Sequence, residues 1–101
     1  MSIERMADRT LPLAERVQAA LLCWDMDDAH RRARAELLAD VAAADRLAQA
    51  GDSWFLASSA YACCESSEVK AAKATLDTAS VEYIVAVDAY RARMAQGVDR
   101  G

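Results

Sequence analysis

The stretch that decides the fold runs from Val69 to Met94 and reads VKAAKATLDTASVEYIVAVDAYRARM. Its apolar residues recur at intervals of three and four, which places them on one face of an α-helix. They are Val69, Ala72, Leu76, Ala79, Tyr83, Val87, Tyr90 and Met94. Within it, Ser80 to Val87 is rich in β-branched and aromatic residues, which favour strands. The helical period continues on both sides of that run and no second strand would pair with it, so we predict a helix throughout.

Composition extends the helical prediction to the whole chain. Alanine, the best helix former, supplies 24 of the 101 residues, against three glycines and one proline. A sheet would need more turn residues than this. The length predicts a single helical domain over residues 1–101. Because alanine buries little apolar area, we also expect a thin core.

The first helix is expected to begin at Thr10, a good N-cap, with Pro12 in the first turn. We expect residues 1–9 and 98–101 to fray. The aspartates within residues 25–28 offer either the N-cap of a second helix or a weak point in one longer helix. We favour a break there, because the apolar face before residue 25 differs from the stripe that follows it.

A second set of boundaries lies in the middle of the chain. Gly51 is the residue type that commonly follows the end of a helix, and Asp52 or Ser53 would cap the next one. Residues 65–68, Glu-Ser-Ser-Glu, resemble another helix start. Two helical arms that meet at Gly51 predict an all-α fold. We expect a compact bundle of three to four antiparallel helices, or a long helical hairpin that dimerises to cover its exposed faces.

The charge balance argues against a nucleic-acid binder. Twelve basic and 16 acidic residues give a net charge of −4, whereas binding to phosphates needs a basic face. The longest uncharged run, Ser53 to Cys64, is too short to span a bilayer. No apolar signal segment opens the sequence, and three cysteines in that context indicate reduced thiols. We therefore expect a cytoplasmic protein, in its native cell or in an infected host.

No catalytic, cofactor-binding or metal site is predicted. Asp25 and Asp27 follow an apolar run, as the nucleophile of dehalogenase-type phosphatases does, but the chain lacks the alternating strands that this chemistry needs. Cys63 and Cys64 are adjacent, so on a helix they point about 100° apart and do not share a metal ion. We expect these thiols and Cys23 to be buried or half-buried, and we predict a protein that is not an enzyme.

Two polar features are also interpreted structurally. His30 has no serine or cysteine placed to act as its nucleophile, so we expect an exposed helical residue. Arg31, Arg32 and Arg34 form a basic cluster that would suit an acidic partner. A solvated face with Asp28–Arg32 and Arg32–Glu36 ion pairs is the favoured interpretation, with partner contact as the alternative.

The aromatic residues are the stronger candidates for a partner surface. Trp54, Phe55 and Leu56 are consecutive, and on a helix they spread over about 200°, so one core cannot absorb all three. Exposed aromatic residues are common anchors of interfaces. Together with Trp24 and the three arginines, these residues are our predicted partner contacts, unless a bundle or a dimer buries them.

Length near 100 and a mid-chain turn with a tryptophan resemble the small Trp-x-Gly secretion-system proteins, which are helical hairpins. Here the order is Gly51-Asp52-Ser53-Trp54 rather than Trp-x-Gly, and the C-terminal tail has no Tyr-x-x-x-Asp/Glu signal. That departure puts membership in doubt and leaves such a protein as one alternative function.

The leading hypothesis is a small, acidic, non-catalytic module that binds a larger protein or protein complex. Small inhibitors of host proteins carried by phages and mobile elements, including anti-CRISPR proteins, have this composition. The other alternative is a self-assembling structural helical protein of a bacterial cytoplasm. No cofactor, nucleic acid or membrane is expected as a partner, whereas a homodimer is possible.

Overall fold

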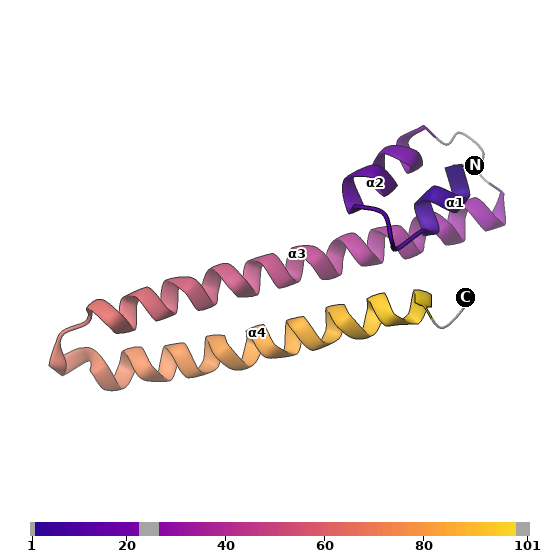
Figure 1. Cartoon of the computed structure of the whole chain (residues 1–101). Coiled ribbons are helices and arrows are strands. Elements are labelled where there is room, and N and C mark those ends of the chain that lie inside the picture. Colours follow the sequence, from indigo (N-terminus) through magenta and orange to yellow (C-terminus); the bar gives the residue numbers. More distant parts are fainter. Residues whose placement is uncertain (1, 23–26, 99–101) are drawn as a thin grey trace. The chain divides into compact units, whose positions relative to one another are not determined.

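The structure is a computed structural model, and it describes residues 2–22 and 27–98 (Figure 1). The described residues form four α-helices and no strand. The helices are α1 (Ser2–Ala7), α2 (Leu13–Leu21), α3 (Asp28–Cys63) and α4 (Val69–Val98). A 3₁₀ turn, Ser66–Glu68, precedes α4. The all-α prediction is confirmed, including the helix through Ser80–Val87, whereas the bundle or dimerising hairpin stays a prediction.

Contacts divide the chain into two compact units. Unit 1 comprises Met1–Ala42 and Ala92–Gly101, and unit 2 comprises Ala43–Arg91. Unit 1 therefore contains α1, α2 and one end each of α3 and α4. Unit 2 contains the remaining lengths of α3 and α4 with the turn that joins them. The number of independent domains stays a prediction, and each unit is described by itself.

The predicted helix end at Gly51 is wrong. Helix α3 continues through Gly51, which has no positive φ. A Cβ placed on Gly51 would lie 3.5 Å from Cε1 of Tyr83, an ordinary contact, so neither the backbone nor the packing at this position requires the helix to end. The break near residue 65 is confirmed, because α3 ends at Cys63 and the 3₁₀ turn leads into α4.

The N-terminal residues also differ from the prediction. Residues Ser2–Ala7 form α1 instead of fraying, because Met6 is completely buried in the core of unit 1 and Ile3 packs against that core. Thr10 is not the N-cap of α2. Its hydroxyl donates to Asp8, and Pro12 precedes the first helical residue, Leu13.

The predicted break between the first two main helices is confirmed. Helix α2 ends at Leu21 and α3 begins at Asp28. Asp27 caps α3, since its Oδ1 accepts a hydrogen bond of 2.9 Å from the backbone N–H of His30. Residues 23–26, with Trp24, lie outside the described residues, as do residues 99–101 of the C-terminal segment expected to fray.

In unit 2, the segments of α3 and α4 lie side by side in opposite directions (Figure 1). Three alanines of these segments are buried: Ala57, Ala79 and Ala86. Large rings occupy the neighbouring positions, where Trp54 stacks on Tyr83 with ring centroids 5.9 Å apart.

The core is thin, as the alanine content predicts. Among the described residues only seven apolar side chains are buried, and five of them are alanines; the other two are Met6 and Leu37. Twelve large apolar side chains are instead more than a third exposed. No described helix is long and apolar enough to cross a membrane.

Candidate protein-binding surface

Three strongly exposed aliphatic residues of unit 2 cluster on α4. Val81, Ile84 and Val85 have exposed fractions of 60%, 60% and 61%. Residues three and four positions apart are neighbours on a helix surface, so these three side chains form one continuous area. We call Val81, Ile84 and Val85 the aliphatic patch. Burying three such side chains in an interface would contribute several kcal/mol, at about 1.5–3 kcal/mol for each side chain buried fully.

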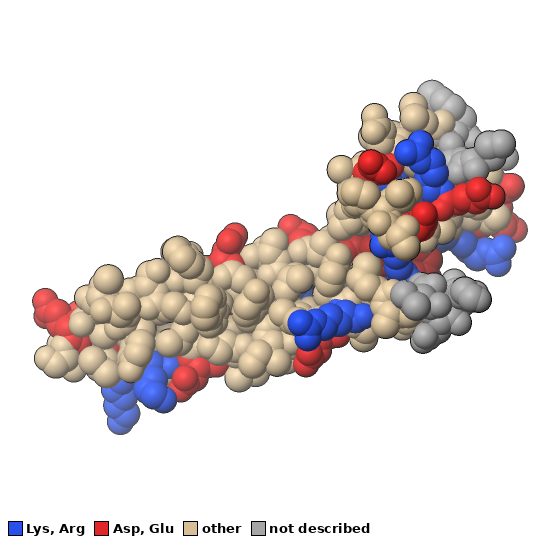
Figure 2. Space-filling view, in the orientation of Figure 1, with Lys and Arg blue, Asp and Glu red and all other residues tan. Residues whose placement is uncertain are grey.

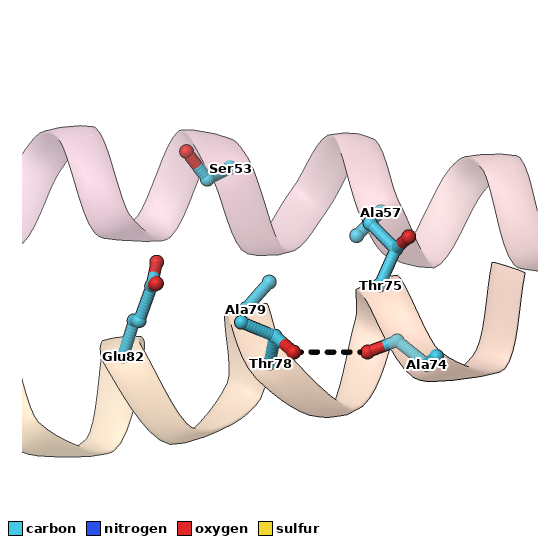
Figure 3. Close-up of a pocket in the computed structure, with 7 residues that line it drawn as sticks. All are labelled: Ser53, Ala57, Ala74, Thr75, Thr78, Ala79 and Glu82. Carbon is cyan, nitrogen blue, oxygen red and sulfur yellow. Dashed lines mark hydrogen bonds between the residues drawn. The ribbon is translucent and has the colours of Figure 1, made fainter. Parts of the chain in front are cut away.

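A shallow groove between α3 and α4 adjoins the aliphatic patch. One part, a hollow of about 420 Å³, is lined by Ala57 of α3 and by small residues of α4 that include Thr78 (Figure 3). The other part, about 430 Å³, is lined by Val81 and Val85 of the patch. Ser53 and Glu82 line both parts, so the groove is continuous. We call this feature the groove.

Most residues that line the first part of the groove are small, whereas Arg46, Gln49 and Glu82 bring charged and polar groups to it. In Figure 3 the hydroxyl of Thr78 points back along α4, where it donates to the carbonyl oxygen of Ala74 at 3.1 Å. Along α4 the groove extends from Ala74 to Ala86. With a rise of 1.5 Å per residue, that distance is about 18 Å, the length of a helix of three turns.

Acidic residues surround the aliphatic patch. Asp77, Glu82 and Asp88 are exposed and lie within one turn of it, and the sequence between Lys73 and Arg91 contains no basic residue. Unit 2 as a whole has seven acidic and four basic residues, a net charge of −3. Figure 2 shows a broad uncharged area over α3 and α4 with charged side chains beside it. The patch is thus an apolar surface with acidic residues of α4 beside it, while Arg46 of α3 lines the groove next to Val81 and Val85.

The aromatic residues that the sequence singled out have different environments. Trp54 is 38% exposed and stacks on Tyr83, so it mainly packs α3 against α4. Phe55 and Leu56 are 64% and 67% exposed, as the consecutive spacing predicts. Contact of any of them with a partner stays a prediction, and Trp24 lies outside the described residues.

The three neighbouring arginines lie in unit 1. Arg31 pairs with Asp28 at 3.5 Å, and Nη2 of Arg34 donates to the carbonyl oxygen of Ala20 at 3.3 Å. The predicted Asp28–Arg32 and Arg32–Glu36 ion pairs do not form. Arg32 is exposed and has no ion pair within the described residues. Glu36 instead pairs with Arg9 and Arg93, which come from distant parts of the sequence.

Sequence reasoning missed an ion cluster at the centre of unit 1. Asp40 of α3 is completely buried and accepts hydrogen bonds from three arginines. Arg9 contributes two bonds of 3.0 Å, Arg16 one of 2.6 Å, and Arg93 one of 2.5 Å. Glu36 accepts further bonds of 3.2 Å from Arg9 and Arg93. We call these five residues the ion cluster.

The ion cluster joins three segments of unit 1 to α3. Arg9 lies between α1 and α2, Arg16 belongs to α2, and Arg93 belongs to α4. Arg16 also donates from Nε to the carbonyl oxygen of Met6, at 2.8 Å. Burial raises the pKa of Asp40, but hydrogen bonds from the three arginines outweigh burial and hold that pKa below its ordinary value of 3.8. Asp40 in turn raises the pKa of Arg9.

A sequence signal for Asp40 existed. Ala33, Leu37, Asp40 and Ala44 are spaced four, three and four apart, so the aspartate lies in the apolar stripe of α3. A charged residue at such a position needs a buried partner of opposite charge. The arginines themselves could not be assigned, because 24 to 53 residues separate them from Asp40 along the chain.

The remaining candidates form no catalytic arrangement in the described part of the chain. His30 is half-buried, not exposed as predicted, because its Nδ1 lies 2.7 Å from Oδ1 of Asp27. No described serine or cysteine hydrogen-bonds to it. Cys63 is exposed, contrary to prediction, and the half-buried Cys64 donates from Sγ to the carbonyl oxygen of Tyr61. Among residues 2–22 and 27–98, no three His, Cys, Asp or Glu residues are placed to hold a metal ion.

Comparison of the chain with protein-family models, with curated proteins and with solved structures finds no match.

Proposed function

We propose that the protein is a non-catalytic protein-binding module that works through the aliphatic patch and the groove. The observation that carries this proposal is the exposure of Val81, Ile84 and Val85, about 60% each, on one face of a single helix. Scattered exposed apolar residues are ordinary, whereas a contiguous apolar area with a polar rim is typical of an interaction site.

The acidic residues beside the patch favour a partner with basic residues over a second copy of this chain. Two copies of this chain that docked patch to patch would bring Asp77, Glu82 and Asp88 of one copy close to the same acids of the other. Like charges across an interface cost several kcal/mol. A partner helix of about three turns, with an apolar stripe and lysine or arginine at its edges, would instead fill the groove and pair with these acidic residues.

A basic rim is common on proteins that bind nucleic acids, because it attracts phosphates. An acidic module that covers such a surface competes with nucleic acid for it. On this ground we propose an inhibitor of a host nucleic-acid-binding protein, with the anti-CRISPR proteins of phages and mobile elements as the nearest class in mode of action. The protein would act in the cytoplasm of the cell that contains its target.

Synthetic helical peptides test the docking surface. The probe is a peptide of three to four turns with a leucine stripe and lysine edges, and the control peptide carries glutamate at the same edges. We expect only the lysine peptide to bind, with an affinity that falls as salt rises. The Ile84→Ser variant should bind more weakly, whereas Leu38→Ser, equally exposed but in unit 1, should bind as the wild type does.

Equal binding of the two peptides, or equal loss in the two variants, would contradict the proposed surface. The inhibitor proposal needs a cellular assay: expression of the chain in cells with an active CRISPR system should restore phage growth, and Ile84→Ser should not. If phage growth stays blocked when the wild-type chain is expressed, the anti-CRISPR assignment is refuted. The docking surface would then be judged by the peptide-binding result alone.

Self-assembly is the second candidate function, because only two buried apolar residues of the described chain are larger than alanine. Light scattering distinguishes it. A monomer over a wide concentration range would remove self-assembly, whereas a stable dimer that buries Ile84 would remove the partner-helix proposal.

A further inference from the structure

We propose a second binding site, in unit 1, for a small organic molecule that carries a dianionic phosphate group. The site is a cavity of about 630 Å³. Three guanidinium groups line it, from Arg9, Arg16 and Arg32, together with the carboxylate of Glu36 and the apolar side chains of Ile3 and Ala33. Small-molecule sites in proteins have this size and combine apolar walls with a few charged groups.

The first argument is charge. Around the cavity, the ion cluster contains three arginines and two carboxylates, which leaves one positive charge. Arg32, at the cavity wall, forms no ion pair with any described residue and adds a second. Among the cavity lining and the ion cluster, arginines thus exceed carboxylates by two, and Asp8, which interacts electrostatically with Arg16, offsets part of this excess. A phosphate monoester, which carries about −1.5 to −2 at neutral pH, matches this positive excess.

The second argument is geometry. The side chain of Arg16 is only 2% exposed and is held at Nε by the carbonyl of Met6 and at Nη2 by Asp40. Those bonds fix the plane of its guanidinium and leave Nη1 without a hydrogen bond to any described residue. Nη1 of Arg9 likewise has no hydrogen bond to a described residue, because the bonds of Arg9 come from Nε and Nη2. Guanidinium N–H groups fixed in position are well suited to phosphate oxygens.

The third argument is the remaining space. A phosphate group fills only a small part of 630 Å³, and the apolar walls at Ile3 and Ala33 suit an uncharged organic group better than water or further ions. A phosphate monoester therefore matches the whole cavity, whereas a free phosphate ion matches only its charged side. This inference is independent of the proposed function, because its residues belong to unit 1.

Titration calorimetry with defined probes tests the site. The probes are phenyl phosphate, inorganic phosphate and benzoate, each titrated into the full chain. We expect phenyl phosphate to bind most tightly, inorganic phosphate more weakly and benzoate weakest. Binding of phenyl phosphate should weaken between pH 7.5 and pH 5, because the second pKa of a phosphate group is about 6.

The variants separate this site from general charge effects. Arg32→Gln removes an exposed side chain that has no ion pair to a described residue, so the fold should persist, and binding of phenyl phosphate should weaken about tenfold or more. Arg91→Gln removes the same charge from an exposed position in unit 2 and should leave the affinity unchanged. Equal affinities for the wild type and Arg32→Gln, or an equal loss in both variants, would overturn the site. Inorganic phosphate that binds as tightly as phenyl phosphate would overturn the assignment to an ester.

Discussion

Replacement of Asp40 by asparagine tests whether the ion cluster holds unit 1 together. The substitution keeps the size of the side chain but removes its charge and one acceptor oxygen. Four hydrogen bonds from three guanidinium groups end on this carboxylate, whose side chain has no exposed surface. In the variant the buried Arg16 loses the only carboxylate that it bonds among the described residues, and the asparagine N–H₂ group faces guanidinium donors with which it cannot bond.

The expected loss is large for a single substitution. Removing one partner of a buried ion pair costs about 3–5 kcal/mol, because the other charge stays buried without compensation. Arg9 and Arg93 retain their ion pairs with Glu36 and are partly exposed, so the lower end of that range applies. We expect Asp40→Asn to lower the free energy of unfolding by about 3 kcal/mol. For a chain of this length, that corresponds to a fall in Tm of more than about 10 °C.

Urea unfolding followed by circular dichroism measures the change, and hydrogen exchange locates it. Protection should fall in α1 and α2 before it falls in unit 2. The matched control is Asp45→Asn, on the same helix, where the exposed carboxylate accepts one bond of 2.9 Å from Gln49. The control should change the free energy of unfolding by about 0.5 kcal/mol or less. A loss below about 1 kcal/mol for Asp40→Asn, or one equal to the control, would refute the stabilising role of the cluster.

Three further predictions concern single features. Gly51→Ala should stabilise the chain by about 0.5–1 kcal/mol, because the added Cβ makes an ordinary contact 3.5 Å from Tyr83 and alanine favours the helix; destabilisation in urea unfolding would contradict a helical Gly51. Trp54→Ala should lower the free energy of unfolding by about 2–3 kcal/mol and Phe55→Ala by less than about 1 kcal/mol in the same assay, because Trp54 stacks on Tyr83 and Phe55 does not. Equal losses would contradict the packing of Trp54 between α3 and α4. The contribution of Asp40 to stability should be constant above its ordinary pKa of 3.8. It should be lost as the pH falls through the lower pKa that Asp40 has in the folded protein, because the carboxylate then takes up a proton. A Tm that stays unchanged down to about pH 2 would exclude this linkage.

Sequence periodicity predicted the helices well but not how they pack. The inward face of α4 matches the predicted stripe: from Ala72 to Met94 its members are buried or half-buried, and only Val69 is exposed. Gly51 shows where such reasoning fails. Glycine marks a helix end when the backbone needs a positive φ, but here the helix continues, and Gly51 lies beside the Tyr83 ring, 32 positions further along the chain. Local sequence contains no information about that contact.

The sequence predicted only part of the candidate surface, because the packing of α4 against α3 cannot be derived from helix periodicity. Consecutive large residues had to spread around the helix, so the exposure of Phe55 and Leu56 followed from geometry alone. Val81 and Val85 were noticed only as a possible strand. Their exposure depends on which face of α4 packs against α3, and the apolar residues of α4 occupy more than one face. Only the paired helices show which of these faces is left uncovered.

The position of Asp40 in an apolar stripe raises the question of whether the ion cluster provides stability or specificity. A buried ion pair is often no more stabilising than apolar residues of the same size, although loss of one member is costly. We therefore expect a variant with Arg9, Arg16 and Arg93 replaced by methionine and Asp40 by leucine to be as stable as the wild type, or about 1–4 kcal/mol more stable.

What the apolar variant should lose is a unique position for α1 and α2, because methionine and leucine contacts lack the direction of the Arg16 bonds to Met6 and Asp40. NMR spectra distinguish the outcomes. We expect broadened or multiple signals for residues 2–22 at unchanged or higher Tm, while unit 2 keeps single sharp signals. A variant that is both less stable and sharply folded would show that the cluster contributes net stability, and it would contradict the specificity argument.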